Sequence, residues 1–152
     1  MKITDILDKD SIISDLKSKD KKGVLEELAA SLSKRTGTAT KDIVKVLLER
    51  EQLGSTGIGG GIGIPHGKLA SINSIVVGFG LSREGVDFDS LDNRPVHIFF
   101  LLVTPVRSTG IHLSVLAQIS KLLKQNHFKE NLLKAESAEE IEQIIHSVDE
   151  EF

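Results

Sequence analysis

The sequence predicts an α/β fold: a single domain over residues 1–152 with a mixed β-sheet flanked by helices on both faces, a three-layer α/β/α arrangement. Helical and strand-like patterns alternate along the chain. The most continuously apolar stretch, residues 96–104, is typical of a central strand that is buried on both faces. A length of 152 residues with 39% hydrophobic and 27% charged residues suits one domain with one core.

Two helices are predicted in the first third of the chain. Asp20 is a good N-terminal cap for the first helix, and Gly37 ends it. Thr40 caps the second helix, which delivers Arg50 to the edge of a glycine-rich segment beginning at Gly54. The apolar residues at helical spacing are Val24, Leu25, Leu28 and Leu32 in the first helix and Ile43, Val44, Leu47 and Leu48 in the second.

Strands are predicted in the middle of the chain. Residues 72–81 form the first and residues 86–88 form a shorter one. A turn containing Pro95 then precedes the buried strand 96–104, and Pro105 ends that strand.

Three helices are predicted near the C-terminus. The first follows Gly110, the second spans residues 129–134, and the third opens with a capping box of Ser137 and Glu140. The residues predicted to face the core are Ile111, Val115, Ile119, Leu122 and Leu123 in the first and Ile141, Ile144, Ile145 and Val148 in the third.

Composition excludes several classes of function. The formal net charge is −3 and basic residues cluster only in residues 17–22, so a nucleic-acid surface is not favoured. An acidic residue interrupts the N-terminal apolar residues and no apolar run is long enough to span a membrane, so we expect a cytoplasmic protein. The chain has no cysteine, which excludes disulfides, a thiol nucleophile and thiolate-bound zinc.

Glycine is concentrated in one segment. Seven of the 13 glycines fall in the fourteen residues from Gly54 to Gly67, and Pro65 and His66 stand near the end of that segment. Such density indicates unusual backbone angles or the close approach of a ligand. Isoleucines alternate with glycine at Ile58, Ile62 and Ile64, which predicts a short strand or extended segment whose other face carries no side chains.

The glycine segment fits neither of two familiar phosphate-binding motifs. A P-loop needs four residues between its glycines and Ser or Thr after the lysine, whereas five residues separate Gly61 from Gly67 and Leu69 follows Lys68. No register of the glycines gives the dinucleotide motif G-x-G-x-x-G opening a helix. Binding of ATP or NAD is therefore not predicted, and no cofactor is expected.

A histidine that accepts a phosphoryl group explains the segment better. Pro65 fixes its own φ and stiffens the approach to His66. Histidine, with an ordinary pKa of about 6.5, is largely neutral near pH 7, so one ring nitrogen can attack phosphorus while a hydrogen bond holds the other. Arg50 and the backbone N–H groups of the glycine segment could bind the phosphoryl oxygens.

These residues resemble a known family. Residues 48–68, from Leu-Glu-Arg-Glu to Ile-Pro-His-Gly-Lys, are similar to the signature of the fructose/mannitol-type (type 2) IIA domains of the bacterial phosphoenolpyruvate:sugar phosphotransferase system. That family includes the nitrogen-regulatory IIA proteins. The resemblance continues through residues 93–103 and 112–123 and so covers nearly the whole chain.

The resemblance implies that Nε2 of His66 accepts a phosphoryl group from the phosphocarrier HPr or its nitrogen-branch homologue. The group then passes to a IIB domain or serves as a signal. Family members pair the acceptor with an arginine and a second histidine, which match Arg50 and His112. Where many relatives carry an acidic residue after the strand-ending proline, this chain has Val106 and Arg107, which adds positive charge to the rim that faces a partner.

Structural alternatives remain open for several candidate residues. Arg50 could be a solvated charge paired with a neighbouring glutamate. His112 could serve to support His66 structurally and have no other role. Ser55 and Thr56 could donate hydrogen bonds to the phosphoryl oxygens or merely shape the turn. The glycines expected to serve backbone geometry are Gly59, Gly60, Gly61 and Gly67.

The other histidines are predicted to be structural, at the surface or satisfied by other partners, with no part in the chemistry. His97 lies in the buried strand, and His127 and His146 lie on amphipathic helices. A metal site at His66 and His112 would lack carboxylate or thiolate ligands and ranks low.

Two functional roles remain open at this stage. A chain without a fused IIB or membrane domain, whose opening residues 1–7 resemble the nitrogen-regulatory branch, favours a regulatory protein in which phosphorylation of His66 switches the binding of partner proteins. The alternative is the IIA component of fructose or mannitol uptake. Neither role involves nucleic acid or insertion into a membrane.

Overall fold

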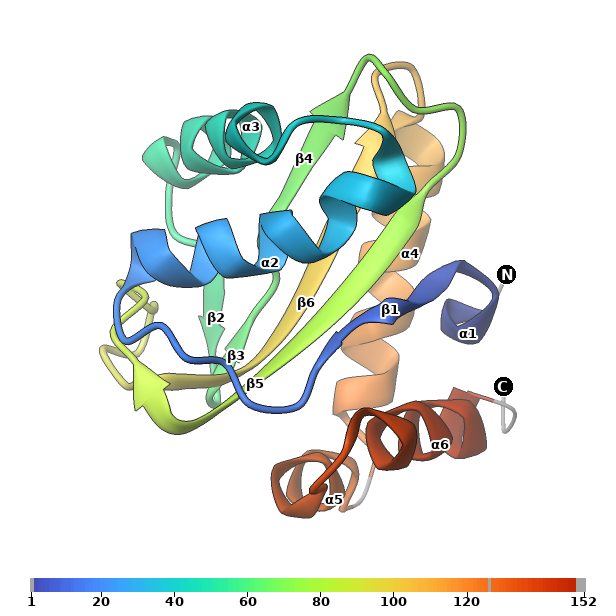
Figure 1. Ribbon diagram of the computed structural model, residues 1–152. Helices are drawn as coiled ribbons and strands as arrows, with labels where there is room; N and C mark the ends of the chain where they lie inside the picture. The colour runs from blue at the N-terminus through green and yellow to red at the C-terminus, as the bar shows by residue number, and fades with distance from the viewer. Residues whose placement is uncertain (1, 126, 150–152) are drawn as a thin grey trace.

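The computed structural model describes residues 2–125 and 127–149, and within them a six-stranded sheet carries helices on both faces (Figure 1). The elements in chain order are α1 (Ile3–Ile6), β1 (Leu7–Ile13), α2 (Lys21–Thr36), α3 (Thr40–Gln52), β2 (Gly57–Gly59), β3 (Ile62–Gly63), β4 (His66–Leu69), β5 (Val76–Val86), β6 (Val96–Pro105), α4 (Thr109–Leu123), α5 (Phe128–Lys134) and α6 (Ala138–Asp149).

The sheet is mixed, and β6 lies at its centre. The strand order is β1-β5-β6-β3-β2, and β4 pairs with β6 on the same side as β3. β5 runs antiparallel to β6, whereas β3 and β4 run parallel to it. The predicted fold class and the predicted central strand are therefore confirmed.

Two hydrophobic cores lie on opposite faces of the sheet. One packs the sheet against α2 and α3, and the other packs it against α1, α4, α5 and α6 (Figure 1). Successive residues of β6 enter opposite cores, with Ile98, Phe100 and Leu102 on the α4 side and Phe99, Leu101 and Val103 on the α2 side. Burial on both faces explains why this strand is apolar without alternation.

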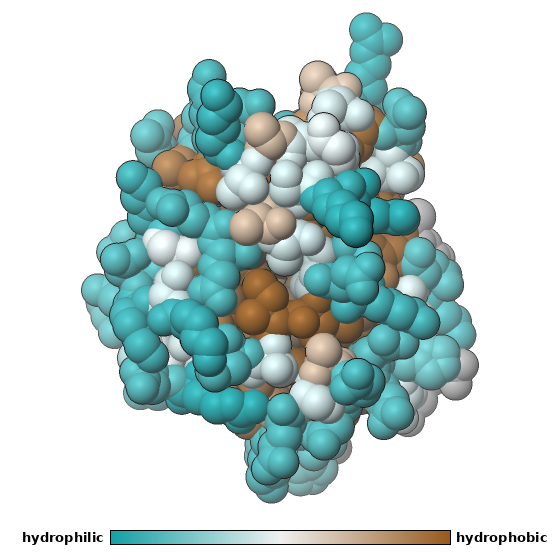
Figure 2. All heavy atoms as spheres, in the orientation of Figure 1, coloured by the Kyte–Doolittle hydropathy of each residue, from teal (hydrophilic) through white to brown (hydrophobic). Residues whose placement is uncertain are grey.

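The face covered by α2 and α3 is largely hydrophilic. Figure 2 shows hydrophobic residues there mainly in a band near its centre. Within residues 2–125 and 127–149, no helix is both long enough and apolar enough to cross a membrane.

The predicted ends of the first long helix are confirmed, but one predicted cap is wrong. Asp20 accepts a hydrogen bond from the backbone N–H of Gly23 at 2.7 Å, and Gly37 ends α2 in the left-handed conformation, with φ of 67°. Thr40 does not cap α3, because Ala39 occupies the cap position and Thr40 is already helical. This start has no side-chain cap, so burial of the apolar stripe of α3 stabilises the helix instead.

The two strands predicted over residues 72–81 and 86–88 are corrected to one strand, β5. It begins at Val76 and continues to Val86. The pairing of β5 with β6 shifts register between Leu81 and Val86, where polar residues and Gly85, with φ of 86°, interrupt the apolar pattern. The irregular register made one strand look like two in the sequence.

The N-terminal strand β1 was not predicted from the sequence. Among the residues that the structure describes, its one partner strand is β5, so it is an edge strand of the sheet. Its residues 8–10 are Asp-Lys-Asp, which hide the strand pattern and protect an exposed edge from pairing with another chain.

The C-terminal helices differ from the prediction in three details. Ile111 does not face the core, because its side chain is 46% exposed and His112 takes the first buried position of α4. α5 begins at Phe128, one residue before the predicted start. The Ser137 hydroxyl accepts from the Glu140 N–H at 3.2 Å, but the Glu140 carboxylate accepts from the N–H of Glu136, so only half of the predicted capping box forms.

The glycine segment contains a tight hairpin. β2 and β3 pair antiparallel, and the glycines at the turn have positive φ: Gly59 at 97°, Gly60 at 67° and Gly61 at 80°. Glycine adopts these angles without the penalty that a Cβ imposes. Ile62 and Ile64 enter the core, whereas Ile58 is 46% exposed, so the predicted extended segment is two short strands with different surroundings.

Candidate active site

His66 begins β4 at one edge of β6. The chain runs beside β6 from Ile62 to Leu69, and Pro65 lies between the two paired segments. Pro65 has no N–H to donate, but its carbonyl accepts from the N–H of Leu102 at 3.0 Å. The sheet therefore fixes the backbone on both sides of the histidine, and the ring of His66 remains half-buried.

Different partners hold the two ring nitrogens of His66. Nδ1 lies 2.8 Å from the carbonyl oxygen of Ile64, which can only accept, so this nitrogen carries the proton. Nε2 then presents its lone pair, and Nε of Arg50 donates to it at 3.1 Å. The site thus has a nucleophilic Nε2 in the tautomer that attack on phosphorus requires.

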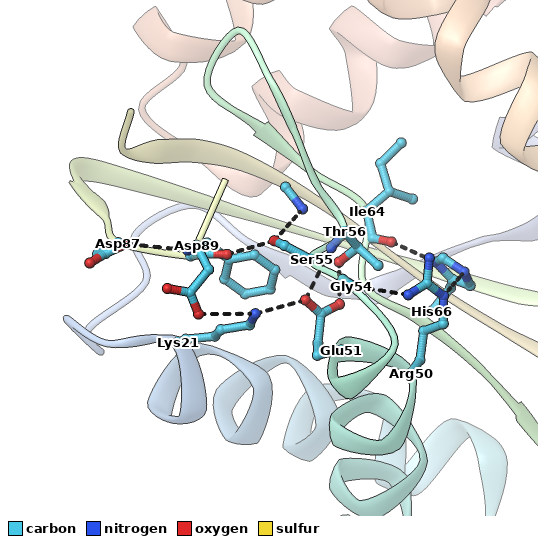
Figure 3. A network of polar contacts seen from close by, with 12 residues as sticks. Lys21, Arg50, Glu51, Gly54, Ser55, Thr56, Ile64, His66, Asp87 and Asp89 are labelled. Atoms are coloured by element: carbon cyan, nitrogen blue, oxygen red, sulfur yellow. Dashed lines mark hydrogen bonds and ion pairs between the residues drawn. The ribbon is translucent and has the colours of Figure 1, made fainter. Parts of the chain in front are cut away.

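Arg50 comes from the last turn of α3. Besides meeting His66, it donates from Nη1 to the carbonyl oxygen of Gly54 at 2.8 Å (Figure 3). α3 can pass close to β4 because Gly67 has no side chain there. A Cβ on Gly67 would stand 3.0 Å from Cγ2 of Val46.

His112 lies in the first turn of α4 and is buried. Its ring centroid is 5.0 Å from that of His66, with 63° between the ring planes. Nδ1 of His112 lies 3.0 Å from the hydroxyl of Thr104, a buried residue near the end of β6. The structure therefore brings His112 next to Arg50 and His66, from which it is far in the sequence.

These three residues line an open hollow between α3, β4 and α4. Its volume is about 450 Å³. Two side chains at its rim, Leu53 and Leu113, are 85% and 61% exposed. Nζ of Lys68 donates to the hydroxyl of Thr109 at 3.2 Å there, so the hollow has a second cation besides Arg50. The lining residues are Val46, Glu49, Arg50, Leu53, His66, Gly67, Lys68, Thr109, His112 and Leu113.

Both histidines of the hollow have pKa values below the ordinary histidine value. Burial is the main cause for His66, the Arg50 charge lowers its pKa further, and the hydrogen bond to Ile64 opposes the shift. Burial also lowers the pKa of His112, and the positive charges that His66, Lys68 and Arg50 can carry lower it further. Both rings are thus neutral at pH 7, as a histidine nucleophile requires.

Several sequence candidates lie away from His66. The Ser55 hydroxyl donates to the carbonyl oxygen of Phe88 at 2.7 Å, and the Thr56 hydroxyl donates to Glu51. Both hydroxyls therefore have partners that shape the loop. Gly59, Gly60 and Gly61 form the hairpin turn, where the N–H of Gly60 donates to Asp92 at 3.0 Å and none of the three lines the hollow.

The structure also shows residues that sequence reasoning missed. Thr104 orients His112, and Lys68 adds charge at the rim. Thr104 did leave a signal, since it is polar at the end of an otherwise apolar strand. Val106, 51% exposed, and Arg107, also exposed, lie on the turn that leads into α4 near the rim.

The remaining histidines do not contribute to the hollow. Nδ1 of His97 lies 2.9 Å from the carbonyl oxygen of Ser82, and the exposed His127 contacts Glu130. His146 is exposed on α6. Across the described parts of the chain, no three histidine or acidic residues are grouped to hold a metal ion.

The sequence matches a known family over most of its length. Residues 5–148 match the family described as "Phosphoenolpyruvate-dependent sugar phosphotransferase system, EIIA 2". The chain belongs to this family. Its members are components of a phosphotransfer system, so the chain has a phosphocarrier or regulatory role in such a system.

Relatives of both functional branches are similar to the chain. The nitrogen regulatory protein of Bradyrhizobium diazoefficiens is 37% identical over 145 residues, which cover 95% of each chain. The fructose-specific EIIABC component of Bacillus subtilis is 39% identical over 150 residues, which cover 98% of this chain and 24% of that much longer protein.

A solved structure supports the fold. The nitrogen regulatory protein IIA-Ntr from Neisseria meningitidis superposes with a TM-score of 0.88 and 36% sequence identity, covering 94% of this chain and 98% of that one.

Proposed function

We propose that this chain is a phosphocarrier in which Nε2 of His66 receives a phosphoryl group from a phosphohistidine of an HPr-type protein. The observation that carries the proposal is the asymmetry of the imidazole. Nδ1 is bound to the Ile64 carbonyl, whereas Nε2 lies in an open hollow beside the Arg50 guanidinium. The same proposal places the chain in the cytoplasm with its donor.

The transfer step exchanges one nitrogen–phosphorus bond for another. The lone pair of Nε2 attacks phosphorus, and the bond from phosphorus to the donor imidazole breaks and returns its electron pair to the donor ring. Nε2 has no proton to lose, so no general base is needed. The step is close to balanced in free energy, and catalysis depends on position and charge.

The two cations that line the hollow suit a phosphoryl group. The Arg50 Nε–H that meets Nε2 in the free protein becomes a donor to a phosphoryl oxygen once Nε2 is bonded to phosphorus. Lys68 adds positive charge at the rim. The neutral ring of His112 packs against His66 and limits its movement.

The apolar rim suits a protein donor. Leu53, directly after α3, and Leu113, on α4, are exposed beside the hollow, as expected of a shallow surface that a partner covers during transfer. Covering the hollow removes water from the charges around phosphorus and strengthens their effect.

We further propose a regulatory role in the nitrogen branch, supported by the TM-score of 0.88 to the Neisseria meningitidis protein. Phosphorylation of His66 adds negative charge in the hollow and would change which proteins bind over it. The 39% identity to the fructose-specific Bacillus subtilis protein supports the second candidate, transfer to a IIB domain during sugar uptake.

The first experiment tests the acceptor. The protein is incubated with phosphoenolpyruvate, enzyme I and an HPr-type donor, and its intact mass is measured at neutral pH. We expect wild type to gain one acid-labile phosphoryl group and His66→Ala to gain none. The control is His127→Asn, which changes an exposed histidine and should gain the phosphoryl group as wild type does. A wild-type protein without phosphate, or equal labelling of His66→Ala, would show the proposal to be wrong.

The second experiment separates the two roles. Phosphorylated protein is mixed with a fructose- or mannitol-type IIB domain, and loss of phosphate is followed by mass. If the phosphoryl group passes to the IIB domain about as fast as His66 accepts it from the donor, the result supports sugar uptake. A phosphate that stays on His66 while binding to other proteins depends on phosphorylation supports regulation.

A further inference from the structure

Glu51 is a buried carboxylate next to Arg50 that the proposed transfer step does not use. It lies in the last turn of α3, and its side chain is only 4% exposed. A charged group so far from water is costly unless other groups pair with it. Its partners therefore indicate what holds it in place.

The partners of Glu51 come from three parts of the chain (Figure 3). Oε1 accepts from the backbone N–H of Thr56 at 3.1 Å and lies 3.0 Å from Nζ of Lys21, the first residue of α2. Oε2 accepts from the Thr56 hydroxyl. The Lys21 ammonium also lies 4.8 Å from the centre of the Phe88 ring, and its side chain is only 20% exposed. One carboxylate thus joins the end of α3, the following loop and the start of α2.

The first route from Glu51 to His66 passes through Gly54. The loop between Glu51 and Thr56 is fixed at both ends, because the Gly54 N–H donates to the Glu51 carbonyl at 3.1 Å while Thr56 is held by the carboxylate. Within this loop the Gly54 carbonyl accepts from Nη1 of Arg50 at 2.8 Å. That bond orients the guanidinium so that its Nε meets Nε2 of His66.

The second route passes through Ile64. The Thr56 carbonyl accepts from the N–H of Ile64 at 3.0 Å, and the Ile64 carbonyl in turn holds Nδ1 of His66. The two hydrogen bonds on the imidazole therefore both lead back to the short loop that Glu51 anchors.

We propose that Glu51, neutralised by Lys21, is a positioning residue that fixes the tautomer and orientation of the His66 imidazole. It touches neither the phosphoryl group nor the donor and acts through the loop of residues 54–56. The effect on the ring is independent of the proposed function, whereas the effect on phosphoryl transfer rests on it.

The test uses Glu51→Gln, which keeps the shape of the side chain and removes the charge that pairs with Lys21. The ring ¹⁵N shifts of His66 are measured by NMR above its pKa, first in wild type and then in the variant. We expect wild type to be the Nδ1–H tautomer and Glu51→Gln to show a mixture containing Nε2–H. The matched control is Asp42→Asn, an exposed carboxylate in the first turn of the same helix.

Transfer kinetics provide the second measurement. We expect Glu51→Gln to lower kcat for phosphoryl acceptance by about tenfold with little change in KM for the donor, because a slightly misplaced nucleophile slows transfer while the rim stays intact. Lys21→Met is expected to shift the tautomer and lower kcat as Glu51→Gln does. Lys21→Arg keeps the positive charge and is expected to keep the wild-type tautomer. The Lys21 variants decide the test if Glu51→Gln does not fold.

The outcomes separate this inference from the proposed function. Folded Glu51→Gln with the wild-type tautomer and kcat would overturn the role of Glu51, even if His66 carries phosphate. A wild-type protein that accepts no phosphate, together with a changed tautomer in Glu51→Gln, would overturn the proposed function and retain the positioning role.

Discussion

Arg50 is held by two hydrogen bonds that leave its planar guanidinium in one orientation. Nε donates to His66 and Nη1 donates to the Gly54 carbonyl. A lysine at this position keeps the charge but has no rigid fork to satisfy both acceptors. The bonds to Arg50 are therefore expected to matter through geometry as well as charge.

The corresponding prediction concerns the rate of phosphoryl acceptance. We expect Arg50→Ala to slow it by about 100-fold, the usual effect of removing a preorganised donor, and Arg50→Lys to be intermediate. Single-turnover transfer from a phosphorylated HPr-type donor measures the rate, and Lys45→Ala, an exposed residue of the same helix, is the control. An unchanged rate in Arg50→Ala would mean that Arg50 is only a solvated charge.

The hydroxyl of Thr104 leads to a prediction about stability. It is buried and lies 3.0 Å from Nδ1 of His112. Thr104→Val keeps the volume but leaves that ring nitrogen unpaired, which should lower the free energy of unfolding by about 1–3 kcal/mol. Urea denaturation measures the change, and Thr104→Ser, which keeps the hydroxyl, should lose clearly less. Equal losses in both variants would assign the effect to packing of the methyl group.

Single residues of the site differed in how well the sequence predicted them. His66 and Arg50 could be found because one lies in the glycine segment and the other shortly before it. Thr104 could not be linked to His112, because their contact exists only once β6 ends beside the start of α4. The charge pair of Lys21 and Glu51 likewise depends on how α2 and α3 pack.

At the scale of elements, the close passage of α3 over β4 positions Arg50. Gly67 makes this possible, since a Cβ there would lie 3.0 Å from Cγ2 of Val46 and 3.5 Å from the Val46 backbone carbon. The helix would have to move away from the strand to accept a larger residue. Gly67 is therefore needed for the distance between two elements, although the hydrogen bonds of the His66 ring go to Arg50 and Ile64.

This spacing can be tested with Gly67→Ala. We expect the variant to lose about 1–3 kcal/mol of stability through overpacking and to transfer phosphate more slowly, because Arg50 moves with α3. The double variant Gly67→Ala/Val46→Ala removes the clashing methyl group and should recover part of both losses. Additive losses in the double variant would contradict the proposed contact.

Elements with a regular pattern were predicted well, and irregular ones were not. The buried β6 and the helix α2 follow simple rules of burial and capping. β1 carries charges because it is an edge strand, and β5 changes register before Val86, so neither shows a clean period of two. The position of His112 on the buried side of α4 was missed because the apolar Ile111 was the more obvious core residue.

At the scale of the whole molecule, the site lies where the two outer layers meet at one edge of β6. α3 belongs to the layer on one face of the sheet and α4 to the layer on the other (Figure 1). Arg50 and His112 therefore approach His66 from opposite faces. When the two cores pack, the rings of His66 and His112 come together, and the hollow that they line stays open to solvent.

This arrangement predicts how the stability of the molecule depends on pH. The pKa values of His66 and His112 in the folded protein lie below the ordinary value of about 6.5, mainly because of burial. Below that value the unfolded chain binds more protons than the folded one, so unfolding becomes more favourable as the pH falls. The stabilisation due to neutral rings is complete above pH of about 6.5 and is lost as the pH falls through the folded-state pKa values.

Urea midpoints of wild type, His66→Gln and the double variant His66→Gln/His112→Gln between pH 7.5 and 5 measure this effect. Wild type should lose the most stability over this range, the double variant the least, and His66→Gln an intermediate amount. Each histidine is expected to account for less than about 1 kcal/mol, because solvent reaches the hollow and reduces the cost of charging the rings. The same pH dependence in all three proteins would show that the cost of charging these rings does not limit stability, and that other groups cause any loss at low pH.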